Sequence, residues 1–128
     1  MGFYSITAVG AGAALGAWLR WWFGMALNPV FPTLPFGTLA ANLTGGYLVG
    51  IAVEYFHHNS VLPTEARLFT ITGFLGGLTT FSTFSAETVT LLLREQYTWA
   101  CVIVFSHVAG SLAMTILGIT TIKWLAQH

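Results

Sequence analysis

Long uncharged stretches separate the few charged residues of this 128-residue chain. Lysine, arginine and glutamate leave four uncharged runs, at residues 1–19, 21–53, 68–86 and 96–122. A membrane-spanning helix needs about 20 apolar residues. The pattern therefore predicts four helical spans, at approximately residues 3–22, 38–53, 65–93 and 98–124.

The third predicted span contains a stretch that suits a continuous helix poorly. Residues 73–85 read GFLGGLTTFSTFS, in which three glycines precede a series of hydroxyl and phenylalanine side chains. Glycine costs about 0.8–1.0 kcal/mol relative to alanine in a helix, and serine and threonine hydroxyls compete for backbone partners. An unbroken helix over residues 68–93 would also measure roughly 39 Å, against a hydrocarbon core of about 30 Å. We predict a break near residues 76–80 whose freed backbone groups build an ion site, because irregular backbone in a membrane must lie in protein or line a wet cavity.

The composition supports an all-α membrane protein that forms a single transmembrane domain over residues 1–128. The chain is 55% hydrophobic and 6% charged, whereas soluble domains carry about 25% charged residues. A net charge of zero and the absence of a basic cluster argue against nucleic acid as a partner. The sequence also lacks a nucleophile–base pair and a phosphate-binding loop, so we do not expect an enzyme.

The four positive charges predict no fixed orientation in the membrane. With four spans, Arg20 and Arg94 lie on one side and Arg67 and Lys123 on the other. Orientation depends on an excess of lysine and arginine on one side, and here the two sides are equal. We therefore expect copies to insert both ways and to pair as an antiparallel homodimer, which is an inverted repeat made from two chains.

Several polar residues in the predicted spans allow two readings. Arg20, among tryptophans, is either an interfacial anchor or a vestibule residue that attracts anions. Thr38 is a candidate N-cap of the second span. Asn42 either links helices by hydrogen bonding or donates its amide hydrogens to a passing anion. Glu87 has either a proton or gating role, or lies close enough to the surface to be in water.

A polar stripe is predicted on the fourth span. His107, Ser111 and Thr115 recur every four residues and so share one helix face. A lone histidine in such a helix is usually a hydrogen-bonded packing residue. Three polar residues in register leave packing and a wet functional stripe equally open.

The polar groups of the predicted pathway favour an anion. No acidic ring lines the middle of the spans, as a cation pore would favour. The candidate donors are one amide, one imidazole and the hydroxyls of Thr79, Thr80, Ser82, Thr83 and Ser111. Phe81 and Phe84 are three residues apart and share a face if helical. Their positively polarised edges suit a small anion, although plain packing is the alternative.

Three motifs resemble the Fluc (CrcB) family of fluoride channels, and the resemblance covers the whole chain. They are GAWLR at 16–20, GTLAAN at 37–42 and GGLTTFSTFS at 76–85. The resemblance implies an antiparallel, dual-topology homodimer that exports fluoride passively across the bacterial inner membrane. It also implies a sodium ion at the dimer centre, held by backbone carbonyls of Gly76 and Thr79 from each subunit.

The resemblance further implies which side chains form the ion pathway. Asn42, Phe81 and Phe84 match the family's pore residues, and Glu87 matches a carboxylate near the pathway. His107 and Ser111 stand where a polar track is expected, with Thr80 and Ser82 beside it. Ile103 replaces a usual hydroxylated residue one turn before His107, so the outer end of the track departs from the family pattern.

The main rival is a small multidrug exporter that couples drug efflux to protons. That chemistry needs a membrane-central carboxylate, placed in the first span in that family, and the first span here has none. A third reading is a structural subunit without transport activity. Fluoride efflux from liposomes distinguishes all three.

Overall fold

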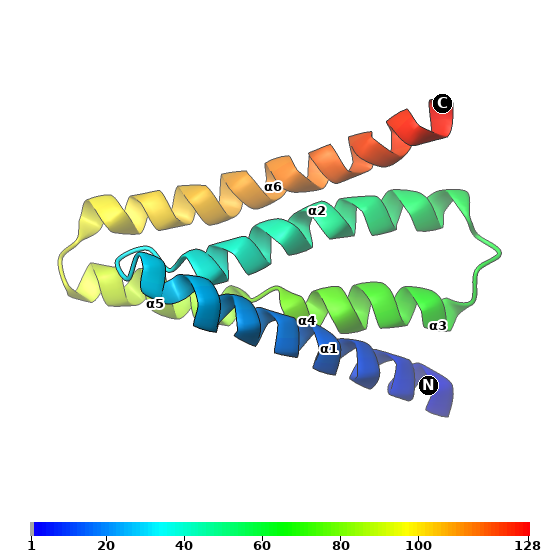
Figure 1. Ribbon diagram of the computed structural model, residues 1–128, viewed down its shortest axis with the longest axis horizontal. Coiled ribbons are helices and arrows are strands. Elements are labelled where there is room, and N and C mark those ends of the chain that lie inside the picture. Colours follow the sequence, from blue (N-terminus) through cyan, green and yellow to red (C-terminus); the bar gives the residue numbers. More distant parts are fainter. Residues whose placement is uncertain (1) are drawn as a thin grey trace.

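The computed structural model describes residues 2–128 as four antiparallel rods (Figure 1). The first two rods are α1, Phe3–Leu27, and α2, Phe36–His58, joined through a 3₁₀ turn at Asn28–Val30. The third rod contains α3 (Thr64–Arg67), a π-helical segment (Leu68–Leu75), α4 (Gly76–Leu78) and α5 (Phe81–Leu93). The fourth rod is α6, Tyr97–Gln127. The two chain ends lie at the same end of the bundle as the α2–α3 connection.

The third rod is interrupted at two threonines. Thr79 (φ −86°, ψ 153°) and Thr80 (φ −147°, ψ 115°) are extended, while Gly76–Leu78 remains helical. This break lies at the far edge of the predicted range of 76–80. The structure therefore places the interruption after the glycines, at the first hydroxylated residues that follow them.

The start of α2 differs from the prediction. The N-cap is Pro35, and Thr38 is the third residue of the helix, so the prediction of Thr38 as N-cap is wrong. A side chain from the preceding turn satisfies this helix end instead, because the N–H of Thr38 donates to Oδ1 of Asn28 at 3.1 Å. The Thr38 hydroxyl is thereby left for another partner, described below.

Glycines allow the rods to pack in two close pairs. In the first pair, a Cβ atom at Gly16 of α1 would collide with the carbonyl oxygen of Phe74 in the third rod. In the second pair, a Cβ atom at Gly50 of α2 would collide with the carbonyl oxygen of Thr115 in α6. Small residues at four-residue spacing produce such backbone contacts between membrane helices.

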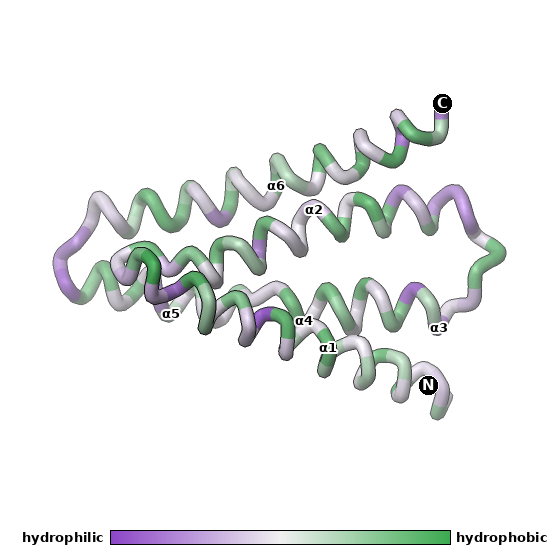
Figure 2. The backbone as a smooth tube through the Cα atoms, viewed as in Figure 1, coloured by the Kyte–Doolittle hydropathy of each residue, from purple (hydrophilic) through white to green (hydrophobic). Residues whose placement is uncertain are grey.

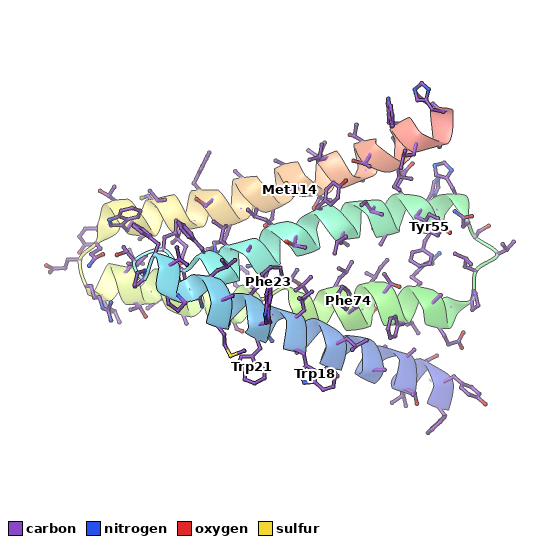
Figure 3. All side chains as sticks on the ribbon, viewed as in Figure 1. Trp18, Trp21, Phe23, Tyr55, Phe74 and Met114 are labelled. Atoms are coloured by element: carbon purple, nitrogen blue, oxygen red, sulfur yellow. The ribbon has the colours of Figure 1, made fainter. Side chains whose placement is uncertain are left out.

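The outer surface is apolar over most of its length. By length and composition, α2 and α6 are each apolar enough to cross a membrane. The hydrophilic stretches gather at the connections between rods (Figure 2). Trp18 and Trp21 of α1 point away from the bundle, whereas Phe23 and Phe74 lie between rods (Figure 3). The helices run past several predicted span limits, and where the membrane meets them stays a prediction.

Candidate functional site

A groove of about 460 Å³ opens at the break, between α2, the third rod and α6. Most of the predicted site residues line this groove: Asn42, Gly76, Thr79, Thr80, Phe81, Phe84, His107 and Ser111. Three others lie outside it. Glu87 and Arg20 line neighbouring cavities, and Ser82 is an exposed residue on the first turn of α5.

Asn42 keeps the third rod interrupted through hydrogen bonds between both polar atoms of its side-chain amide and the backbone of Thr80. Its Oδ1 accepts the N–H of Thr80 at 2.7 Å, and its Nδ2 donates to the Thr80 carbonyl oxygen at 3.0 Å. The same Nδ2 lies 2.9 Å from Nδ1 of His107. An amide nitrogen has two hydrogens, so both are used within the chain. This geometry supports the helix-linking reading of Asn42, and an additional role toward an anion stays a prediction.

The break leaves three backbone carbonyls without donors, those of Gly76, Leu78 and Thr79. In a continuous helix the Gly76 carbonyl would accept the N–H of Thr80, and the Thr79 carbonyl that of Thr83. Those two N–H groups instead donate to Oδ1 of Asn42 and to Oγ1 of Thr80, at 2.7 and 3.1 Å. Within residues 2–128, no hydrogen-bond donor lies on the carbonyl oxygen of Gly76 or Thr79.

The neighbouring carbonyl of Gly77 is already occupied. Arg20 of α1 donates from Nε to the Gly77 carbonyl oxygen at 3.0 Å. Arg20 is therefore partly buried and bound to the third rod, which an interfacial anchor alone does not require. It also lines a cavity of about 310 Å³ shared with Thr38, Thr80 and Thr83.

The two helix ends at the break carry opposite partial charges. The third rod approaches the break with the C-terminal, negative end of α4, and leaves it with the N-terminal, positive end of α5. Thr80 caps α5, because its Oγ1 accepts the N–H of Thr83. A broken membrane helix of this kind presents carbonyls to a cation on one side and N–H groups to an anion on the other.

Phe81 and Phe84 share one face of α5, as predicted. Their ring centroids lie 5.6 Å apart with a 67° angle between planes, so one ring presents an edge to the other. Phe84 is buried, with 8% of its surface exposed, and lies 4.6 Å from the ring of His107. Phe81 remains 79% exposed although it lines the groove. The single chain therefore leaves one of its two groove phenylalanines uncovered.

The polar stripe of α6 faces α2. Thr115 donates from Oγ1 to the Gly46 carbonyl oxygen at 2.9 Å, so this residue links two helices. His107 is 4% exposed, and its Nδ1 must accept from Asn42, because an amide nitrogen only donates. A neutral His107 then carries its hydrogen on Nε2, which is buried and has no partner within residues 2–128. His107 thus offers an uncommitted donor, whereas Thr115 is fully used in packing.

Glu87 is bound by Thr38, the residue that the sequence predicts as a helix cap. Its Oε2 accepts the Thr38 hydroxyl at 2.6 Å, while Oε1 is buried without a partner in the described chain. Glu87 lines a cavity of about 300 Å³ that also includes Arg94. No pattern in the sequence links positions 38 and 87, nor Arg20 to Gly77, because both contacts arise only when separate rods pack together.

Comparisons with known proteins agree on one family. A family model described as "CrcB-like protein, Camphor Resistance (CrcB)" matches residues 7–119. A protein of Nitrosospira multiformis named "Fluoride-specific ion channel FluC" is 82% identical over 128 residues, covering 100% of both chains. Proteins with the same name from Cupriavidus taiwanensis and Tolumonas auensis are 55% and 57% identical, over 98% and 97% of this chain and 100% and 98% of theirs.

Proposed function

The chain belongs to the CrcB family, and from this we infer that it is a fluoride-specific ion channel, as its relatives are named. It is a membrane protein and not an enzyme. It moves fluoride by passive electrodiffusion. The rival reading, a proton-coupled multidrug exporter, gains no support from the names of these relatives.

The chemistry of the groove carries this conclusion from the structural side. One buried donor, Nε2 of His107, has no partner in the described chain, and the exposed ring of Phe81 lies in the same groove. A buried polar group without a hydrogen bond is costly, so a site that leaves one open fits an incoming acceptor. Fluoride is a small anion that accepts hydrogen bonds and meets the positive edge of a phenyl ring. The Ser111 hydroxyl extends this set of donors along α6.

We propose that the functional unit is an antiparallel homodimer in which a second copy covers the groove. The 79% exposure of Phe81 supports this, because a second copy would cover the apolar ring that the single chain leaves exposed in the groove. The equal distribution of arginine and lysine between the two ends supports insertion in both orientations. Four spans in each copy then surround two pathways.

We propose that a sodium ion lies at the centre of this dimer, bound by the carbonyl oxygens of Gly76 and Thr79 from each copy. The fit is supported by the absence of donors on these two carbonyls. The described residues contain no cluster of three or more His, Cys, Asp or Glu side chains that would hold a metal another way. Backbone carbonyls are suitable ligands for an alkali cation in a membrane protein. When bound, the ion supplies a fixed positive charge between the two broken helices.

The physiological role follows from the acid–base chemistry of fluoride. Hydrogen fluoride crosses membranes as a neutral molecule in acid surroundings, then ionises inside the cell and is trapped. A channel in the bacterial inner membrane lets fluoride leave down its electrochemical gradient and so relieves its toxicity. Two assignments stay predictions: the place of Arg20 in the vestibule, and the roles in the ion pathway of Asn42, Thr80, Ser82 and Glu87.

A liposome assay tests the proposed function. Purified protein is reconstituted in fluoride-loaded liposomes, and efflux is followed with a fluoride-selective electrode after a potassium ionophore clamps the membrane potential. We expect rapid fluoride efflux, no comparable chloride efflux, and no dependence on an imposed proton gradient. Efflux that requires a proton gradient would favour the exporter, and no fluoride efflux would refute the proposal.

A further inference from the structure

We propose that Arg20 is a positioning residue for the cation site, which it builds by holding the Gly77 carbonyl. This inference rests on the sodium site proposed above. Arg20 donates from Nε to the Gly77 carbonyl oxygen at 3.0 Å and does not contact Gly76 or Thr79 by any hydrogen bond in the described chain. Its effect on the two carbonyls proposed as ligands is therefore indirect, through the backbone that connects them.

The backbone at Gly77 is fixed from two directions. A Cβ atom at Gly77 would collide with the carbonyl oxygen of Ala13, so the α carbon of this residue lies directly against α1. Arg20, on the same helix α1, then holds the Gly77 carbonyl oxygen. Helix α1 therefore fixes both the position of the Gly77 α carbon and the direction of its carbonyl bond. The carbonyls on either side of Gly77 then keep a fixed geometry. A rigid set of carbonyls is needed because a site that must reorganise for each ion binds it more weakly.

The Arg20 bond also decides which carbonyls remain free. Leaving the helix at Thr79 removes the normal donors from several carbonyls in succession. Arg20 satisfies the Gly77 oxygen and Asn42 satisfies the Thr80 oxygen. The carbonyls of Gly76, Leu78 and Thr79 are left, and those of Gly76 and Thr79 are the two proposed ligands. Arg20 thus removes a competing oxygen from the site as well as orienting its neighbours.

The charge of Arg20 and its hydrogen bond make opposite predictions for sodium binding. A guanidinium close to a bound cation repels it, so removal of the charge alone should tighten sodium binding. Removal of the hydrogen bond should loosen it, because the Gly77 carbonyl and its neighbours lose their orientation. The sign of the change therefore separates positioning from simple electrostatics.

Two neutral substitutions of equal length isolate the hydrogen bond. In Arg20→Gln, Nε2 is attached to Cδ at the same place along the side chain as Nε of arginine, and it still donates. In Arg20→Met, a methyl group occupies that place and cannot donate. Arg94→Met is the control for charge, because Arg94 is exposed and lies after α5 at the end of the bundle that carries the α1–α2 connection.

The measurement is the sodium concentration that gives half of the maximal thermal stabilisation of the purified full-length protein. Sodium is titrated against N-methylglucamine at constant ionic strength, because a ligand that binds only the folded state raises its stability with concentration. We expect Arg20→Met to raise this concentration about tenfold and Arg94→Met to leave it within about twofold of the wild type. Arg20→Gln, which keeps the donor and loses the charge, should leave this concentration unchanged or lower it. A general loss of stability would lower the melting temperature equally at every sodium concentration and leave the midpoint in place.

Three results would overturn the inference. They are an unchanged or lower sodium midpoint in Arg20→Met, an equal rise in Arg94→Met, and a tenfold rise in Arg20→Gln despite its retained donor. A tenfold rise in Arg20→Gln would overturn the inference even if the Met variant does not assemble. A wild-type protein that is insensitive to sodium would instead remove the sodium site itself, and the role of Arg20 with it.

Discussion

Replacing Asn42 with alanine tests how the break is maintained. Asn42 makes two hydrogen bonds to the backbone of Thr80, at 2.7 and 3.0 Å, and Thr80 is buried. Without the amide, the Thr80 N–H can regain a partner only by returning to the Gly76 carbonyl. That change extends α4 through the break and rotates Phe81 and the residues after it.

The size of the effect follows from these two bonds. Each contributes about 1 kcal/mol net, so their loss shifts the balance from the broken toward the wound form by about 2 kcal/mol. This corresponds to a roughly 30-fold fall in the ratio of broken to wound protein. Fluoride efflux per reconstituted protein should fall, by at most this factor, because efflux follows the fraction of protein in the broken form. The protein should still fold because the rods pack elsewhere.

The assay is fluoride-electrode efflux from liposomes, with size-exclusion chromatography to show that the protein remains assembled. Asn59→Ala is the matched control, because the side chain of Asn59 donates to the Tyr55 carbonyl, at the exposed end of α2 and away from the break. Its efflux should equal that of the wild type. Wild-type efflux in assembled Asn42→Ala protein would refute the claim that Asn42 keeps the break open.

Three further substitutions have defined outcomes. Phe81→Ile should abolish most fluoride efflux because it removes a polarised ring edge, whereas Phe3→Ile, with a similar exposure of 77% against 79%, should not change efflux. Gly16→Ala should lower the free energy of unfolding by about 1–3 kcal/mol, because the new methyl group collides with the third rod. Gly10→Ala should be tolerated, because a methyl group there meets nothing within 4 Å. Thr38→Val should lower stability by about 1–3 kcal/mol, measured in the same melting assay, because the carboxylate on α5 loses its 2.6 Å donor; an unchanged melting temperature would mean that this contact is not formed.

The sequence was sufficient to predict the helical rods and the interruption of the third one. Uncharged runs predicted the number and approximate positions of the rods, and the hydroxylated residues after the glycines indicated where a helix would end. The exact place of the break depended on tertiary contacts. Gly76–Leu78 stays helical against α1, and the chain leaves the helix only where Asn42 offers Thr80 an alternative partner.

The candidate site was predictable as a list of residues but not as a network. Spacing placed Phe81 with Phe84 and His107 with Ser111, because those pairs lie on single helices. Contacts between rods were not predictable in the same way. Thr38 was expected to cap a helix, and it binds Glu87 instead, because the side chain of Asn28 already satisfies the helix end. The link between Arg20 and Gly77 likewise depends on how closely α1 packs against the third rod.

The most direct test of the whole account is the reversal potential of the reconstituted protein in a planar lipid bilayer. A fluoride gradient is imposed across the bilayer, with equal chloride on both sides. A fluoride-selective channel predicts a current that reverses at the fluoride equilibrium potential and moves with it when the gradient is changed. A reversal potential that stays at zero while fluoride is varied, or a bilayer without current at any protein density, would contradict the account.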